Sequence, residues 1–377
     1  MNMRLSSLAI SLFLTGAFVA CESADPAESA LDAGGAGGGA GAVACDANAG
    51  RKVLDAPSCK ALASDYSPAN GSKDDAWAAC VSDDGAFHPF NPSVGSNART
   101  AAFAEMSALL GFGGTKVPAP KDFLDAKVAY SQPEGLQSRV ARREDTHYPP
   151  AVVGGKEVGC RDLDAAAIAA NPDRCVSQAR IQPLVETALN EGAKGNDPVL
   201  NAARVEAGLL WFSYVSVFKE IETCGTEDKE DCDSATGYYG GVQTRESPIG
   251  LGAYVKALSP QAHDRIWDGF LAVRCWRDLD QAMPLGDVAM REQAQQQVDR
   301  ATLRGLALIV RERLQNAPTC GVAFETVRVL GPVLGRAAKE RDAAKAAVLA
   351  AEVAKTVPAE VDVKVASDAI DALFPCP

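Results

Sequence analysis

The chain has 377 residues, of which 47% are hydrophobic and 23% are charged, a composition that excludes disorder as the state of the whole chain. Its 37 Lys and Arg residues stand against 49 Asp and Glu residues, which gives a net charge of −12. This balance argues against nucleic acid and anionic lipid surfaces as partners, because phosphate recognition needs a basic surface.

Residues 1–20 have the pattern of a bacterial export signal. Arg4 precedes the apolar run from Leu5 to Phe18, which is long enough for a signal peptide and too short for a membrane-spanning helix. The sequence Phe18-Val19-Ala20-Cys21 resembles the lipobox of bacterial lipoproteins, with Phe18 where that family usually has Leu. The resemblance implies that Cys21 carries the lipid and anchors the mature chain in a membrane. The alternative is a plain secretory signal that is cut elsewhere, such as after Ala17.

Residues 21–50 are rich in Gly and Ala and contain almost no large apolar side chain. Such a segment cannot bury enough surface to offset the entropy lost on ordering, so a flexible tether is predicted there. Glu22 follows the lipobox Cys, and in Gram-negative lipoproteins the absence of Asp at this position implies delivery to the outer membrane. The helical domain is expected to occupy residues 51–377.

Cysteine usage agrees with export. The chain has eleven Cys, and assigning Cys21 to the lipid leaves an even ten, all of which are expected to form disulfides in an oxidising compartment. No CxxC spacing occurs, which disfavours a zinc or redox-thiol site. The predicted local pairs are Cys160 with Cys175 and Cys224 with Cys232.

Capping residues and apolar spacing predict an all-α fold. Asp197-Pro198 and Ser259-Pro260 each place a capping residue before a proline, which starts a helix because its missing N–H is not needed there. The helix from Pro198 is apolar on most sides and is expected to be central and buried. Further helices are predicted at 97–110, 120–143, 176–192, 287–315, 319–338 and 337–356, with long loops at 81–96, 144–160 and 225–250.

A short internal similarity suggests duplication. Arg161-Asp162-Leu163-Asp164 recurs as Arg277-Asp278-Leu279-Asp280, and each copy lies close to a Cys. A duplication would divide the helical domain into halves at 51–250 and 251–377, with the two copies as equivalent turns. Their aspartates would either form Arg–Asp pairs or supply a Ca²⁺ site, although the Gly and the distal Glu of an EF-hand loop are missing.

An exported, Ala-rich helical lipoprotein that divides into two bundles resembles the imelysin-like bacterial surface proteins, whose implied role is the uptake of iron or haem. The resemblance covers roughly residues 95–355. The Gly-x-His-x-x-Glu motif of that family is absent here, since His88, His147 and His263 all lie in other contexts. No metal-site residue can therefore be carried over, and neither a metal nor a cofactor is assigned.

The first candidate site lies where the helix predicted for residues 120–143 gives way to a loop that contains Pro149-Pro150. Arg142 and Arg143 could clamp a carboxylate, whereas Glu144, Asp145 and His147 could ligate a divalent cation. Alternatively, these side chains form ordinary helix-end ion pairs.

The second candidate site is the predicted loop from Thr223 to Gly250. It combines acidic residues, a Cys224–Cys232 pair and the adjacent Tyr238 and Tyr239 beside glycines, a composition typical of recognition loops. The Tyr rings could instead anchor the loop on the bundle through their rings and hydroxyls.

The function predicted is that of a lipid-anchored binding protein of the cell envelope, with a protein or a small ligand as partner and no nucleic acid. The chain contains no GxSxG, HExxH, P-loop or CxxCH sequence, so an enzyme is disfavoured. The alternatives are a metal-uptake protein or metal-dependent enzyme that uses Glu144, Asp145 and His147, and a structural envelope component.

Overall fold

The computed structural model describes residues 45–55, 61–68, 77–114, 116–133, 135–226, 228–242, 244–279 and 287–375, which belong to one compact unit. These residues are mainly helical, so the predicted all-α class is confirmed. None of the helices in this part of the chain has the length and apolar character needed to cross a membrane. Cys21, the signal sequence and most of the predicted tether lie outside the described residues.

The helices follow one another along the chain with short connections. Their bounds are α1 (Gly95–Leu110), α2 (Pro120–Ser131), α3 (Gln137–Val140), α4 (Ala165–Ala170), α5 (Gln182–Ala193), α6 (Pro198–Thr226), α7 (Asp231–Gly240), α8 (Gly250–Leu258), α9 (Pro260–Leu279), α10 (Val288–Asn316), α11 (Gly321–Leu330), α12 (Gly335–Arg341), α13 (Ala343–Val353) and α14 (Val363–Leu373). Shorter 3₁₀ turns occur at Val81–Asp84, Cys160–Asp162, Gly331–Leu334 and Pro358–Glu360.

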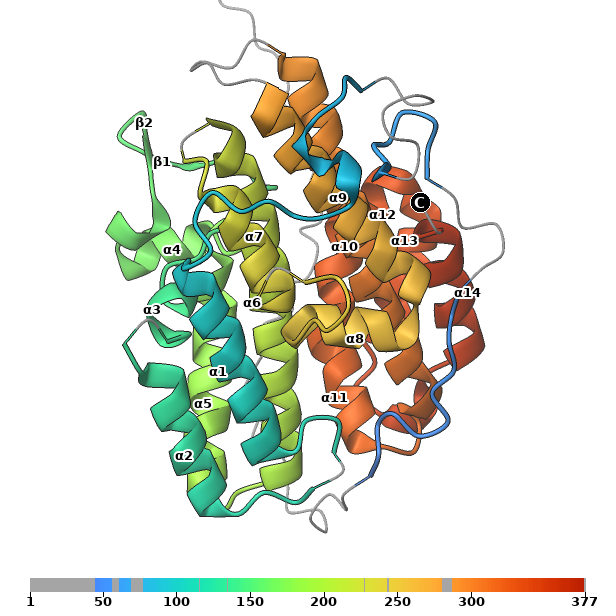
Figure 1. Cartoon of the computed structure of the whole chain (residues 1–377). Coiled ribbons are helices and arrows are strands. Elements are labelled where there is room, and N and C mark those ends of the chain that lie inside the picture. The colour runs from blue at the N-terminus through green and yellow to red at the C-terminus, as the bar shows by residue number, and fades with distance from the viewer. Residues whose placement is uncertain are drawn as a thin grey trace, which may run out of the picture. The chain divides into compact units, whose positions relative to one another are not determined.

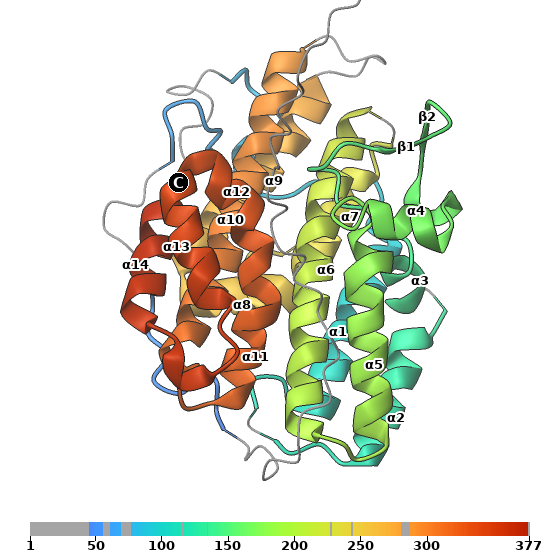
Figure 2. The same ribbon diagram turned by 180° about the vertical axis from the view of Figure 1, so that it is seen from behind.

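The helices form two groups that meet along α6. One group contains α1, α2, α5, α6 and α7, and the other is built around α10 with α8, α9, α11 and α14, as Figures 1 and 2 show from opposite sides. Contacts of α6 with α10 and α11 join the two groups. Residues 205–217 of α6 are all buried, which confirms the prediction of a central helix that is apolar on most sides.

The predicted helix starts at Pro198 and Pro260 are confirmed. The Ser259 hydroxyl accepts a hydrogen bond from Ala262 N–H at 3.0 Å, so Ser259 caps α9 as expected. At α6 the backbone carbonyl of Asp197 accepts the first helical bond, from Asn201 N–H at 2.9 Å. Four further helices, α4, α10, α13 and α14, are capped by the carboxylates of Asp164, Asp287, Asp342 and Asp362.

Three of the predicted helices are interrupted. The stretch 337–356 divides at Asp342, whose extended backbone separates α12 from α13, and the other two divide at a proline. The stretch 120–143 divides into α2 and α3 at Pro133, and Gln132 before it has ψ 154°, because a proline disfavours helical backbone in the residue that precedes it. The stretch 319–338 likewise divides at Gly331-Pro332, where a 3₁₀ turn separates α11 from α12. In both cases proline decides the break.

The predicted loop 144–160 contains a small β-hairpin. Strands β1 (Ala151–Val153) and β2 (Lys156–Val158) pair antiparallel, with Ala151 opposite Val158. The turn between them consists of Gly154 and Gly155, whose φ angles are +59° and +77°. Two adjacent residues of positive φ suit a two-residue hairpin turn, and glycine adopts such angles without strain.

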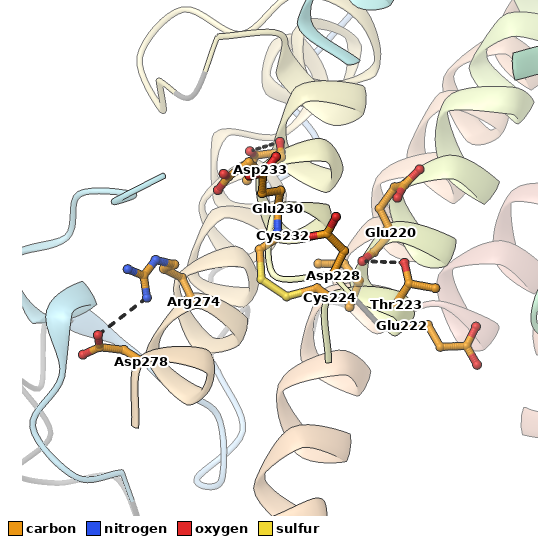
Figure 3. The surroundings of a disulfide bond; sticks show 12 residues. Glu220, Glu222, Thr223, Cys224, Asp228, Glu230, Cys232, Asp233, Arg274 and Asp278 are labelled. Carbon is orange, nitrogen blue, oxygen red and sulfur yellow. Dashed lines mark hydrogen bonds and ion pairs between the residues drawn. A yellow bond between two sulfur atoms is a disulfide. The ribbon is translucent and has the colours of Figure 1, made fainter. Parts of the chain in front are cut away.

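The prediction of a loop through 225–250 is wrong, because α7 occupies its middle. The Cys224–Cys232 disulfide forms as predicted, but it joins the end of α6 to the first turn of α7 (Figure 3). Tyr238 and Tyr239 are 2% and 0% exposed on α7. Burial of these rings against the bundle outweighs the Gly-rich and acidic composition that indicated a loop.

Residues 45–50, which the sequence analysis assigned to the tether, belong to the folded part. Ala47 is fully buried and its N–H donates to Gly113 O at 2.8 Å. Cys45 forms a disulfide with Cys320, beside the first turns of α6. This contact between residues far apart in sequence orders a segment whose composition alone predicts flexibility.

The other bridges connect Cys160 with Cys175, as predicted, and Cys80 with Cys275. The prediction for Cys59 and Cys376 concerns residues outside the described part. The two RDLD copies are not equivalent turns: Arg161 and Asp162 lie in a 3₁₀ turn, whereas Arg277 and Asp278 lie inside α9. The expectation of matching turns is therefore wrong, and Asp280 lies outside the described residues.

Candidate functional site

A cavity of about 660 Å³ lies at the C-terminal end of α6. One wall comes from α6 itself, and the other from the segment that follows α3 and leads into the β-hairpin. The lining residues are Arg142, Arg143, Glu144, Thr146, His147, Tyr148, Pro149, Pro150, Arg174, Lys219, Glu222 and Thr223. The structure thus gathers four members of the first candidate site, Arg142, Arg143, Glu144 and His147, around one hollow.

Glu144 is held by two donors and fixes one side of the cavity. Its Oε1 accepts the Cys160 N–H at 2.7 Å, and its Oε2 pairs with Arg174 Nε at 2.9 Å. The Cys160–Cys175 disulfide places Arg174 beside this carboxylate, and Arg174 also donates to Tyr148 O at 2.8 Å. Glu144 therefore organises the cavity wall through structural contacts.

His147 lies between two carboxylates. Its Nδ1 is 2.6 Å from Asp145 Oδ1 and its Nε2 is 3.1 Å from Asp299 Oδ1, while the ring stacks on Phe218 at 3.5 Å between centroids. Burial disfavours the charged ring, but the hydrogen bonds and charges of Asp145 and Asp299 outweigh burial and raise the pKa of His147. Both ring nitrogens are therefore suited to donate, as in an imidazolium.

Arg143, which lines the cavity, pairs with the carboxylate of Glu220 at 2.6 Å, and both side chains are almost fully buried. Burial raises the pKa of Glu220, but the charges of Arg143 and Lys219 outweigh it and the pKa is lowered. Figure 3 shows Glu220 and Thr223 on the last turns of α6, beside the disulfide. Lys219 reaches both Glu220, at 3.4 Å, and Asp231, at 3.7 Å.

Arg142 differs from the other basic groups of this wall. Its side chain is exposed, and within the described part of the chain it forms no ion pair or side-chain hydrogen bond. It belongs to a cluster of arginines on and around α3. Burial lowers the pKa of Arg139, and the positive charges of Arg99, Arg142 and Arg143 lower it further.

The two tyrosines of the second candidate site are internal. Arg99 donates to the Tyr238 hydroxyl at 3.2 Å, and the guanidinium of Arg143 lies 5.1 Å from the centre of the Tyr238 ring. Tyr238 therefore contacts two members of the arginine cluster, Arg99 and Arg143. The Tyr239 hydroxyl is 2.8 Å from His263 Nδ1 of α9. The prediction that either ring is an exposed contact is therefore wrong, because the rings are buried and anchor α7 to the bundle.

The side chains predicted as metal ligands, Glu144, Asp145 and His147, are bonded to other groups of the protein. Glu144 pairs with Arg174, and Asp145 is occupied by the ring and the N–H of His147. Among the described residues, no group of three or more His, Cys, Asp or Glu side chains is arranged to hold a metal ion. The observed chemistry of this region is that of ion pairing and hydrogen-bond donation.

Several residues of the site were missed by the sequence analysis. Thr146 lies inside the first candidate run without being a predicted ligand, and its hydroxyl is buried in the cavity wall. Arg174 could have been linked to Glu144 through the predicted Cys160–Cys175 pair. Lys219 and Glu220 end the apolar run of α6, and such a change of polarity in a buried helix is a usable signal. Nothing near Asp299 in sequence indicates its contact with His147.

Comparisons of the chain with models of protein families, with curated proteins and with solved structures find no match.

Proposed function

We propose that the chain is a lipid-anchored binding protein of the bacterial cell envelope, and that its ligand occupies the cavity at the C-terminal end of α6. The observation that carries the binding role is the cavity itself, about 660 Å³ in volume and lined by polar and charged side chains together with Tyr148, Pro149 and Pro150. Cavities of several hundred Å³ with a few convergent polar groups are typical of small-molecule sites. A purely structural envelope component needs no such hollow.

The anchoring part of the proposal rests on the sequence from Phe18 to Cys21 and on the disulfides. Four bridges among the described residues support maturation in an oxidising compartment. Acyl chains contribute about 0.8 kcal/mol per buried CH₂, and stable anchoring takes more than one chain. The metal-uptake alternative has no supporting geometry, since Glu144, Asp145 and His147 are engaged with protein partners.

The anchor is tested by Cys21→Ser in the expressing cell, with Ser23→Ala as a neighbouring control. The Cys21 variant should move from the membrane fraction to the soluble fraction and lose incorporation of a labelled fatty acid, whereas the control should behave as the wild type. If the Cys21 variant stays in the membrane fraction with its label, the lipid-anchor proposal is wrong.

The cavity is tested by filling it. Glu222→Trp places a large ring in the wall, and Glu105→Trp makes the same chemical change on the exposed surface of α1. A panel of small carboxylates, phosphomonoesters, neutral amides and amines is screened for thermal stabilisation, since a ligand that binds the folded state raises its melting temperature. Some member of the panel should stabilise the wild type and Glu105→Trp by a few degrees and leave Glu222→Trp unchanged. Absence of any such compound at millimolar concentration would refute the binding role.

A further inference from the structure

We propose that the ligand of this cavity is an organic oxyanion, a carboxylate or a phosphate monoester, bound by the guanidinium of Arg142 and the hydroxyl of Thr146. The inference rests on the proposed binding function and adds the class of the ligand.

The charge of the cavity wall is the first argument. Its basic side chains are Arg142, Arg143, His147, Arg174 and Lys219, against the two acidic side chains Glu144 and Glu222. In the described part of the chain, every one of these basic groups except Arg142 has a carboxylate partner within 4 Å. The chain has a net charge of −12, and yet among the described residues no carboxylate pairs with the guanidinium of Arg142 at this cavity.

The surroundings of Arg142 add a second argument. The positive charges of Arg142 and Arg143 both act on Arg139, and this repulsion adds to burial in lowering the pKa of Arg139. Arg143 directs one nitrogen to Glu220, which leaves Arg139 and Arg142 without an ion pair among the described residues. An anion placed beside Arg142 would relieve this repulsion, and a planar guanidinium can bind a carboxylate or a phosphate through two parallel hydrogen bonds.

The unused hydrogen-bonding groups of the wall, within the described residues, are an N–H that can only donate and a hydroxyl that can donate. Thr146 Oγ is buried without a partner, and so is Nε of Arg143, a residue that is 5% exposed. Buried polar groups are usually satisfied, so a hydroxyl and an N–H left without partners in a cavity wall indicate a missing acceptor. A carboxylate or a phosphate supplies acceptor oxygens.

The rest of the lining indicates that the anion is organic. Tyr148, Pro149 and Pro150 present ring surfaces to the cavity, and its volume far exceeds that of an inorganic ion. The oxyanion group would therefore bind at Arg142 and Thr146 while an apolar body packs against these rings.

The probes for the test are benzoate, its neutral isostere benzamide, phenyl phosphate, acetate and inorganic phosphate, titrated calorimetrically into the full mature chain. Benzoate or phenyl phosphate should bind at least tenfold more tightly than benzamide, and the tighter of the two identifies the oxyanion. Acetate and inorganic phosphate should bind more weakly than their phenyl counterparts, because they lack the apolar body.

Three variants assign the binding to the named groups. Arg142→Gln should weaken binding of the preferred anion about tenfold, and Arg142→Lys should recover part of the loss because it keeps the charge but not the fork. Thr146→Val should weaken binding without lowering the melting temperature of the free protein, since its hydroxyl has no partner there. Arg161→Gln, which removes one exposed positive charge outside the cavity, should bind as the wild type does.

The outcomes separate this inference from the proposed function. If benzamide binds as tightly as benzoate, or if Arg142→Gln binds the anion unchanged, the cavity is a binding site but the oxyanion assignment is wrong. If inorganic phosphate binds as tightly as phenyl phosphate, the organic part of the inference is wrong. If none of the probes binds and the wider panel also fails, both proposals are overturned.

Discussion

Two clusters of charged side chains lie along α6, and they are built differently. Toward the N-terminal end, Glu206 and Arg313 pair at 2.9 Å with side chains that are 0% and 1% exposed. Both oxygens of Glu206 are engaged, because Tyr254 donates to one and Gly113 N–H to the other. About 20 Å further along the helix lies the cavity cluster, the charged and polar side chains of Arg142, Arg143, Thr146 and Glu220. Among the residues that the structure describes, Arg142 has no ion pair there and the buried Thr146 hydroxyl has no partner.

The difference between the two clusters distinguishes charged side chains that hold helices together from charged side chains that are available to a ligand. At the first cluster, Arg51 and Arg313 face Glu206 and Glu312, so positive and negative groups are matched in number. At the second, arginines outnumber the carboxylates that reach them, and a cavity opens beside them. Matched buried charge holds elements together, whereas unmatched charge beside a cavity is available to a ligand.

The largest difference between the two ends of α6 is expected from their disulfides. The Cys45–Cys320 bridge spans 275 residues, and the Cys80–Cys275 bridge shortens the effective loop, whereas the Cys224–Cys232 bridge spans 8. Chain entropy then predicts a loss of about 4–5 kcal/mol for Cys45→Ala with Cys320→Ala and about 2–3 kcal/mol for Cys224→Ala with Cys232→Ala. Urea unfolding measures both. If the two variants lost equal amounts of unfolding free energy, or lost them in the reverse order, the N-terminal end of α6 would not be the more structural of its two ends.

The next effect concerns Arg313. Changing Arg313 to Met leaves Glu206 buried without its charged partner, which should lower the free energy of unfolding by about 4 kcal/mol. Adding Glu206→Gln should recover a part of the loss, because the uncompensated charge is then removed. As a control, Lys364→Met breaks an exposed pair with Asp368 and should change stability far less. A small loss for Arg313→Met would mean that this cluster is no more structural than the cavity cluster.

A smaller effect, about 2 kcal/mol, is expected at His147, and it depends on pH. Asp145 and Asp299 face its two nitrogens, and Tyr214 and Arg336 lie beside Asp299. Because the pKa of His147 is raised in the folded state, its contribution is complete below the unfolded value of about 6.5 and is lost as pH rises through the folded value. His147→Gln should therefore be most costly near pH 5.5, and the cost should shrink at alkaline pH.

His263 provides the matched comparison. Burial lowers the pKa of His263, whose nitrogens contact the Tyr239 hydroxyl and Arg245 O. Its contribution should be present above the unfolded pKa and fade in acid, so the cost of His263→Gln should have the opposite slope. Urea unfolding at pH 5.5, 7 and 8.5 measures both variants. Parallel slopes would show that His147 is not held as an imidazolium.

The smallest effect is expected at Arg142. With no partner in the described structure, Arg142→Gln should change the free energy of unfolding by less than about 0.5 kcal/mol. The contrast with Arg313→Met is the sharpest test of the comparison, since both remove one guanidinium. A loss above about 1 kcal/mol would indicate a structural role for Arg142 in the free protein.

Much of the helical framework follows from local signals. The pairs Asp197-Pro198 and Ser259-Pro260 predict the starts of α6 and α9, because a helix start depends on one capping residue and one backbone angle. Disulfides between cysteines close in sequence can be predicted for the same reason, that they depend on local residues. Cys160 and Cys175, which lie 15 residues apart, are an example. In contrast, α7 is not indicated by its own sequence, because Tyr238 and Tyr239 pack against Phe212 of α6 and Phe270 of α9, which lie outside the segment.

The candidate site divides in the same way. The run from Arg142 to His147 stands out in the sequence because it concentrates charge at a helix end before two prolines. Which of its members remain available could not be predicted, since the partners come from Arg174, Glu220 and Asp299. Tyr238 and Tyr239 were placed on an exposed loop because composition does not report burial.

The sequence by itself determined the helical class, the main helix starts, two disulfides and the location of the charged run, all of which depend on residues close together in the chain. The tertiary structure decided the folding of residues 45–50, the burial of the tyrosines and the pairing of every charge around the cavity. The physical reason is that electrostatic and packing energies depend on distances in space. Arg142 and Arg143 are adjacent in sequence, and yet Glu220 pairs with Arg143 and, within the described residues, not with Arg142.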